Sequence, residues 1–252
     1  MAAHTSPMEA ATAAIRYSRL LDLAPTDEQT NALKEWQRIS PDIILGLNAR
    51  RPVSVHAAAP LVRVLGRLFF RGELDNIVYI AQDINSHGFT SLDNQGRLMI
   101  TIDIDHRHSS RDKDRATSVV STILHECVHA YFDRVVCIGY PRTPECEALG
   151  CKAKEFDELA HVGKRGGHGL AWHELALEVE SLAGMMLGME IRLGRDGAAE
   201  LHTRTTGDRF SRDVYMRLFP GRHVGCGSED GGIILIIEDE KTEGKEDDEG
   251  VK

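Results

Sequence analysis

The chain has 252 residues, of which 42% are hydrophobic and 27% charged, an ordinary balance for a globular protein with one sizeable domain. Its longest purely aliphatic run, residues 233–237, is far shorter than the roughly 20 residues that span a bilayer, so we expect no membrane partner. The net charge of −9 divides into −5 for residues 238–252, where eight acids face three lysines, and −4 for the rest. Such a composition excludes the strongly basic class of nucleic-acid-binding proteins.

Cysteine usage and the N-terminal residues bear on the compartment. Five cysteines, an odd number, fit a reducing environment better than a framework of disulfides. The first residues lack the basic segment and apolar core of a secretory signal, and Glu9 and Asp22 argue against a transit peptide. We therefore expect an intracellular protein of the nucleus or cytoplasm. Residues 238–252 have almost nothing apolar to bury, so we expect a disordered acidic tail.

The residues up to about 72 are expected to be helical. Thr26 followed by Gln29 has the form of a capping box, and Leu33 and Trp36 continue at helical spacing. A second helical run is expected after Pro60. We interpret residues 1–54 as an N-terminal helical extension that packs on the domain that follows.

Two strands are expected next. Residues 76–80 are rich in β-forming side chains, and residues 98–105 alternate between aliphatic and mostly polar side chains. The turn-forming residues 93–96 predict a hairpin or meander, and hence a small antiparallel sheet. We expect Asp103 and Asp105 on a solvated strand face. We also expect the free edge of 98–105 to accept an extended peptide.

A long helix is expected from about residue 114 to 136, and it carries an H-E-x-x-H motif at 125–129. His125 and His129 lie one helical turn apart on the same face, so both rings can reach one metal ion. Glu126, beside the first ring, can take a proton from water at that metal. Two imidazoles and a carboxylate are costly to bury in so apolar a helix without a metal. We interpret them as a zinc site with Glu126 as the catalytic base.

The third ligand has several candidates near the second core helix, which is expected to begin at His168 or Leu170. The spacing H-E-x-x-H-x-x-G-x-x-H is excluded, because positions 132 and 135 are phenylalanine and valine. His168 is favoured, because the glycines on both sides let the backbone approach an ion closely and adopt unusual angles, while Trp172 anchors the following helix. The other candidates are Glu174, Glu178, His161 and His173.

The sequence HECVHAY at 125–131, followed by G-H-G-x-x-W-x-x-L at 167–175, resembles the SprT-like domain, shared by bacterial SprT proteins and the Spartan DNA–protein crosslink proteases. The resemblance covers about residues 55–190. It implies an α+β fold with a compact zincin (minigluzincin-like) core. It also implies His125, His129 and His168 as zinc ligands, Glu126 as the catalytic acid/base, and DNA-bound or crosslinked proteins as substrates.

The region between the two motifs is unusually long and polar. We interpret 133–166 as an insertion within a metallopeptidase domain of residues 55–237. Cys137, Cys146 and Cys151, with His161, could bind a second, structural zinc, but their spacing matches no standard finger, and free thiols are the favoured interpretation.

The expected function is hydrolysis of peptide bonds in a protein or peptide substrate, by water activated at zinc with Glu126 as general base. The alternative is a non-catalytic adaptor whose zinc site is structural. Glu126 favours the enzyme, because a purely structural site needs no carboxylate at that position.

Overall fold

The computed structural model describes residues 5–49, 52, 54–95, 97–103, 115–136, 168–206 and 210–220. The chain divides into two compact units, Met1–Asp208 and Arg209–Lys252. The expected insertion at 133–166, with its cysteines and His161, lies almost wholly outside the described residues, as do Ile104, Asp105 and the acidic tail. Among the residues that are described, no helix has both the length and the apolar character needed to cross a membrane.

Three helices open the first unit: α1 (Pro7–Leu23), α2 (Asp27–Asn48) and α3 (Val55–Phe69). The predicted capping box of α2 is confirmed, since Thr26 accepts from the Gln29 backbone while the Gln29 side chain accepts from the Thr26 backbone. The expected start of the next helix after Pro60 is wrong, because α3 begins at Val55 and contains that proline. Pro60 removes one hydrogen bond of α3, which it would have donated to the carbonyl of residue 56, but the helix continues on both sides of it.

The sheet has three strands, β1 (Val78–Gln82), β2 (Gly88–Leu92) and β3 (Leu98–Asp103), in the order β1-β3-β2. The predicted hairpin at 93–96 is confirmed, because β2 and β3 pair antiparallel across it. The expectation of an antiparallel sheet is wrong, because β1 pairs with β3 in parallel and the sheet is mixed. The fold is therefore α+β, as expected, with one strand that the sequence analysis did not identify.

The strand expected to offer a free edge is the central strand. β3 pairs with β1 on one side and β2 on the other, so within the described part of the chain the free edges belong to those two strands. The expected solvated face is also wrong for Asp103, which is completely buried together with Thr101 on the same face of β3. Alternation predicted the strand correctly, but it could not show that both of its faces are covered.

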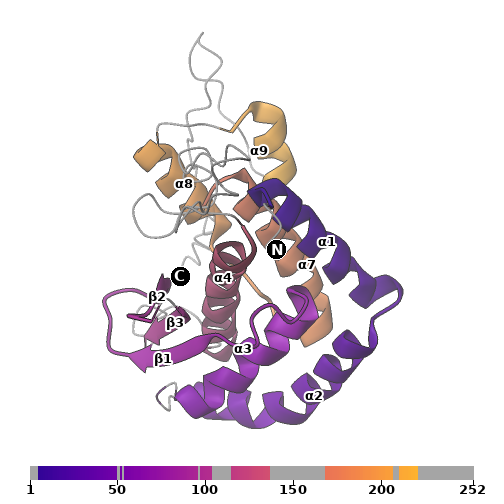
Figure 1. Ribbon diagram of the computed structural model, residues 1–252, viewed down its shortest axis with the longest axis vertical. Helices are drawn as coiled ribbons and strands as arrows, with labels where there is room; N and C mark the ends of the chain where they lie inside the picture. Colours follow the sequence, from indigo (N-terminus) through magenta and orange to yellow (C-terminus); the bar gives the residue numbers. More distant parts are fainter. Residues whose placement is uncertain are drawn as a thin grey trace, which may run out of the picture. The chain divides into compact units, whose positions relative to one another are not determined.

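Four more helices complete the described structure: α4 (Arg115–Val135), α7 (Leu170–Leu187), α8 (Arg195–Thr206) and, in the second unit, α9 (Arg212–Leu218). The predicted limits of the motif helix and of the second core helix agree with α4 and α7. In the first unit, α4 packs against β2 and β3 on one side and against α7 on another, which places the motif helix in the middle of the core (Figure 1). α1 runs along α7, and its Ala10, Ala11 and Ala14 are buried there.

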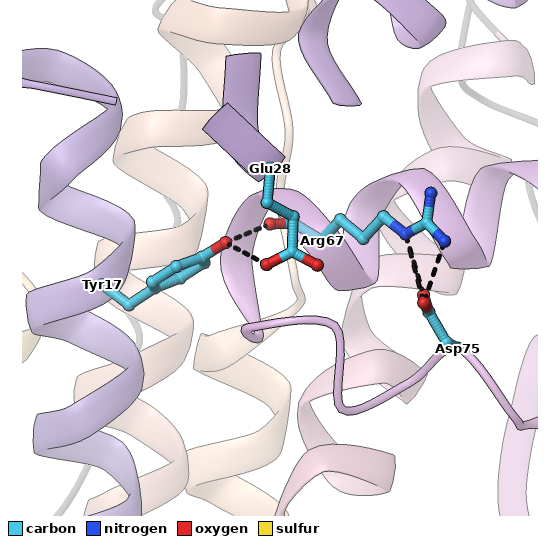
Figure 2. A network of polar contacts seen from close by, with 4 residues as sticks. All are labelled: Tyr17, Glu28, Arg67 and Asp75. Carbon is cyan, nitrogen blue, oxygen red and sulfur yellow. Dashed lines mark hydrogen bonds and ion pairs between the residues drawn. The ribbon is translucent and has the colours of Figure 1, made fainter. Parts of the chain in front are cut away.

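A polar network ties the first three helices together where α3 ends (Figure 2). The Tyr17 hydroxyl lies 2.8 Å from the Arg67 carbonyl oxygen and 3.2 Å from Oε2 of Glu28. The Arg67 guanidinium pairs with Asp75 at 2.9 Å, in the turn that follows the helix. Gly72, in that turn, has a φ of +69°, and Glu28 Oε1 lies 2.8 Å from where its Cβ would stand. The backbone conformation therefore favours glycine, whereas the exposed Glu28 side chain could move aside for a Cβ.

Gln29 connects the same helices from a fully buried position. Its side-chain amide donates to the carbonyl of Tyr17 at 2.9 Å and to the carbonyl of Leu68 at 3.1 Å. The Leu68 carbonyl lies in the last turn of α3, where carbonyls lack intrahelical donors, whereas Tyr17 lies within α1. One side chain thus caps α2 through its oxygen and supplies donors to α1 and α3 through its nitrogen.

We expect Gln29→Ala to lower the free energy of unfolding by about 2 kcal/mol, because the cap is lost and two buried carbonyls lose a donor. Urea unfolding monitored by circular dichroism measures this change. Gln37→Ala, at an exposed position of the same helix, is the matched control and should change stability by less than about 0.5 kcal/mol. Equal midpoints for the two variants would show that the buried amide has no special role.

Candidate metal centre

Three histidines meet between α4 and the start of α7. His125 and His129 come from successive turns of α4, and His168 lies two residues before α7 begins. They form the one group of potential metal-ligating side chains found in the described part of the chain. The structure thus brings together the three residues that the sequence favoured.

The three rings point their Nε2 atoms toward a common centre. The Nε2–Nε2 distances are 3.2 Å between His125 and His129, 3.1 Å between His129 and His168, and 3.2 Å between His125 and His168. The ring centroids are farther apart, at 5.0, 4.8 and 5.1 Å for the same pairs. Since the nitrogens form a smaller triangle than the ring centres, each ring directs Nε2 inward.

That triangle has the size a tetrahedral metal ion requires. For Zn–N bonds of about 2.0–2.1 Å and tetrahedral angles, two ligand nitrogens lie about 3.3 Å apart. The observed 3.1–3.2 Å is close to this value. Mutual hydrogen bonding explains the arrangement less well, because each pair would need an N–H directed along one side of the triangle, whereas the rings aim at its centre.

Trp172 forms the wall behind the imidazoles. The indole is completely buried, and its centroid lies 4.9 Å from that of His125, 5.6 Å from that of His129 and 4.5 Å from that of His168. Trp172 comes from the first turn of α7, directly after His168. The tryptophan therefore holds all three rings against one rigid surface, which extends the anchoring role expected for it.

Burial favours the neutral imidazoles that a metal site needs. Burial lowers the pKa of His125, lowers that of His129 well below its usual range, and lowers that of His168 to about 2. For His129 the neighbouring His125 and His168 contribute to the same effect. Neutral rings keep the nitrogen lone pairs free, so the site does not need to lose protons before it binds a cation near neutral pH.

Glu126 is buried beside these ligands, at the contact between α4 and β2. Its Oε2 accepts a hydrogen bond of 2.9 Å from the Thr90 hydroxyl, which also lies 3.1 Å from the Glu126 carbonyl oxygen. Burial raises the pKa of Glu126 to about 7, while the Thr90 hydrogen bond opposes that rise. A carboxylate in this environment can both accept and release a proton near neutral pH.

A short segment after α7 holds His125 from outside the site. His125 Nδ1 lies 2.8 Å from the Leu193 carbonyl oxygen, which can only accept, so Nδ1 carries the proton and Nε2 is free to bind a metal. Leu193 is held in turn by Glu180 of α7, because the Leu193 backbone nitrogen donates to Glu180 Oε1 at 2.6 Å. Glu180 Oε2 also pairs with Arg195 at 2.5 Å.

The same segment, residues 188–194, which we call the strap, has a glycine of positive φ at each end. It begins with Gly188 and ends with Gly194, at φ of +67° and +69°, backbone conformations that favour glycine. Between them, the Arg192 backbone donates to the Ser121 hydroxyl at 3.2 Å, one turn before His125 on α4. The strap therefore orients His125, a candidate ligand, in the way that outer groups orient metal ligands generally.

The other candidates for the third ligand lie elsewhere. Glu178 pairs with Arg19 of α1 at 2.9 Å, and Glu174 is not part of the histidine group. His173 is completely buried, but its ring packs edge-on against Trp172 rather than joining the triangle. His161 lies outside the described residues. Gly169 has an ordinary extended conformation with φ of −69°, so the expected backbone strain at this glycine is not found.

Several residues around the site were not identified from the sequence. Thr90, Glu180 and Leu193 lie far along the chain from the motif they contact, and no local pattern marks them. His87, directly before β2, contributes to the lowered pKa of His125. The strand that carries Thr90 was itself not predicted. Without that strand, no sequence signal could place the Thr90 side chain.

We expect His168→Ala to remove stable metal binding, because two imidazoles from one helix turn leave the ion without its third protein ligand. The measurement is zinc content after chelation, reloading and gel filtration, with about one ion per wild-type chain. His56→Ala, at an exposed position of α3, is the control and should retain the ion. Full zinc occupancy in the His168 variant would contradict the three-histidine site.

We expect Glu180→Ala to weaken zinc binding by about 10- to 100-fold, because the strap loses the group that fixes the acceptor of His125. Competition with a chromophoric chelator measures the affinity. Glu178→Ala is the matched control on the same helix, since its partner Arg19 belongs to α1 and lies outside the strap. Equal affinities in the two variants would show that the strap does not position the ligand.

Comparisons with other proteins do not add to this geometry. No family model, no curated protein and no solved structure matches the chain. The resemblance to the SprT-like domain therefore rests on the two sequence motifs, and the chemistry of the site rests on its own residues. Those residues establish a group of three buried or partly buried histidines close enough to bind one metal ion.

Proposed function

We propose that the chain is a zinc-dependent peptidase whose zinc ligands are His125, His129 and His168. The observation that carries the proposal is the inward-pointing triangle of Nε2 atoms, 3.1–3.2 Å apart, with a buried carboxylate on the residue next to one ligand. Three imidazoles suit zinc, and a site with three protein ligands leaves a position for water or substrate. A zincin-like core of the kind the motifs imply agrees with this arrangement of sheet, motif helix and second helix.

A zinc ion bound there supplies an electrophile that makes a water molecule more acidic and polarises the carbonyl of the scissile bond. The role of Glu126 is to accept the proton of the attacking water and to deliver it to the leaving amine nitrogen. Burial of Glu126, which places its pKa at about 7, suits a group that gives and takes a proton in one cycle. His125, held by Leu193 through Nδ1, keeps the correct tautomer throughout.

The free edge of β2 is the place for an extended substrate. β2 pairs with β3 alone in the described residues, and Glu126 packs directly beneath it. A peptide added to this edge would bind mainly through its backbone, which gives recognition tolerant of sequence. We therefore propose unfolded or extended protein segments as the substrate class. Action on DNA-bound or crosslinked proteins is carried by the family resemblance alone.

The adaptor interpretation differs in what it requires of Glu126. A structural site needs only its ligands, and a buried carboxylate beside them would be a cost without a use. The hydrogen bond from Thr90 and the position under a free strand edge give this carboxylate a defined orientation. These features favour the enzyme over the adaptor.

We expect Glu126→Gln to reduce peptide hydrolysis by about 10²- to 10⁴-fold with zinc retained, because the amide keeps the shape of the side chain but cannot accept the proton. The assay uses zinc-loaded full-length protein with casein and with a mixture of fluorogenic peptides. Glu73→Gln, at an exposed position between α3 and β1, is the control and should behave as the wild type. Undiminished cleavage by the Glu126 variant would refute its role. No cleavage by zinc-loaded wild type would favour the adaptor.

A further inference from the structure

The edge strand β2 and the carboxylate of Glu126 fit together closely. An added Cβ at Gly88 would lie 3.2 Å from Glu126 Cγ, 2.9 Å from Ile102 Cδ1 and 3.0 Å from the Thr101 carbonyl oxygen. The last two contacts allow little adjustment, because they lie on the neighbouring strand. Gly88 therefore leaves space for the glutamate side chain, and Thr90, two residues along on the same face, reaches its carboxylate.

The backbone N–H and C=O groups of Gly88 and Thr90 point to the free edge of β2. His87 accepts from the Asp103 nitrogen at 3.0 Å, and the Asp93 nitrogen donates to Arg97 at 2.9 Å. In the register of β2 and β3, these are hydrogen-bonded pairs, and such pairs alternate along an antiparallel ladder. The N–H and C=O groups of Gly88 and Thr90 therefore face away from β3, where an added strand would bind.

We propose that Thr90 is a positioning residue that fixes the carboxylate of Glu126 relative to a substrate bound on β2. This inference rests on the proposed peptidase function. The hydroxyl at 2.9 Å occupies Oε2, which leaves Oε1 as the oxygen that exchanges a proton. The Thr90 backbone meanwhile contributes to the edge on which the peptide lies. One residue thus sets the distance between the scissile bond and the base.

The test compares Thr90→Val with Thr90→Ser. Valine has nearly the shape of threonine but no hydroxyl, whereas serine retains the hydroxyl. With zinc-loaded full-length protein and a cleaved peptide, we expect Thr90→Val to lower kcat by about 10- to 100-fold with KM within about twofold, and Thr90→Ser to restore most of kcat. Ser91→Ala is the matched control, because its hydroxyl belongs to the same strand and has no partner among the described residues.

Two kinetic results would overturn the proposal. Wild-type kcat in Thr90→Val would show that the hydroxyl bond does not matter, and equal losses in the valine and serine variants would assign the effect to packing. Zinc content and melting temperature should stay at wild-type values in all three variants, which separates positioning from a general loss of structure.

A crystallographic comparison tests the same contact without any activity. In zinc-loaded crystals, the Glu126 side chain should keep one orientation in the wild type and in Thr90→Ser, and should rotate or occupy several orientations in Thr90→Val. An unchanged carboxylate in Thr90→Val would refute the proposal. If the wild type binds zinc but cleaves no peptide, the proposed function fails, and this comparison still decides whether Thr90 positions Glu126.

Discussion

The candidate centre depends on the packing of α4 against α7, in which the Trp172 side chain of α7 lies against the histidines. The indole is completely buried and lies against all three imidazoles, so the ligands from two helices share one rigid neighbour. A protein interior has little free volume, and a ring of that size cannot shift without opening a void. The imidazoles are therefore placed by packing, and hydrogen bonds such as that from His125 to Leu193 only have to select the tautomer.

The N-terminal helices support the same two helices from outside. The Tyr131 hydroxyl, on α4, donates to the Ala10 carbonyl of α1 at 3.1 Å, and Arg19 of α1 pairs with Glu178 of α7. The small side chains of Ala10, Ala11 and Ala14 allow α1 to approach closely. Gln29, near the start of α2, then links that helix to Tyr17 of α1 and to Leu68 of α3. Residues before 55 thus share one core with the helices that carry the metal ligands.

The sequence predicted those parts of the structure that depend on local patterns. Helical periodicity placed α4 and α7, the capping box placed the start of α2, and the H-E-x-x-H spacing with the G-H-G motif selected the three histidines. Each of these signals lies within a few turns of the chain. β2 was missed because its five residues begin with glycine and carry only two large apolar side chains, Phe89 and Leu92, which are exposed. Its identity depends on pairing with β3, which no short window contains.

The remaining errors have a similar cause. Alternation in residues 98–103 indicates a strand but not its place in the sheet, so a central strand was expected at the edge. β1 pairs in parallel with β3, although β2 lies between these two strands in the sequence. Composition does not reveal this strand order. Thr90 contacts a residue 36 positions away, and Leu193 one 68 positions away. Contacts at such separations depend on the whole fold.

An edge strand is well placed beside Glu126, the proposed catalytic base, because of the geometry of strands. Backbone N–H and C=O groups lie in the plane of a sheet, whereas side chains stand perpendicular to it. A residue on an edge strand can therefore bind a further strand in one direction and a core helix in the other. On a central strand both in-plane edges are already used, as they are in β3, which pairs with β1 on one side and with β2 on the other. Among the described strands, β2 joins a free edge to the surface of α4 above Glu126, so under the proposed function substrate alignment and carboxylate orientation would converge on Gly88 and Thr90.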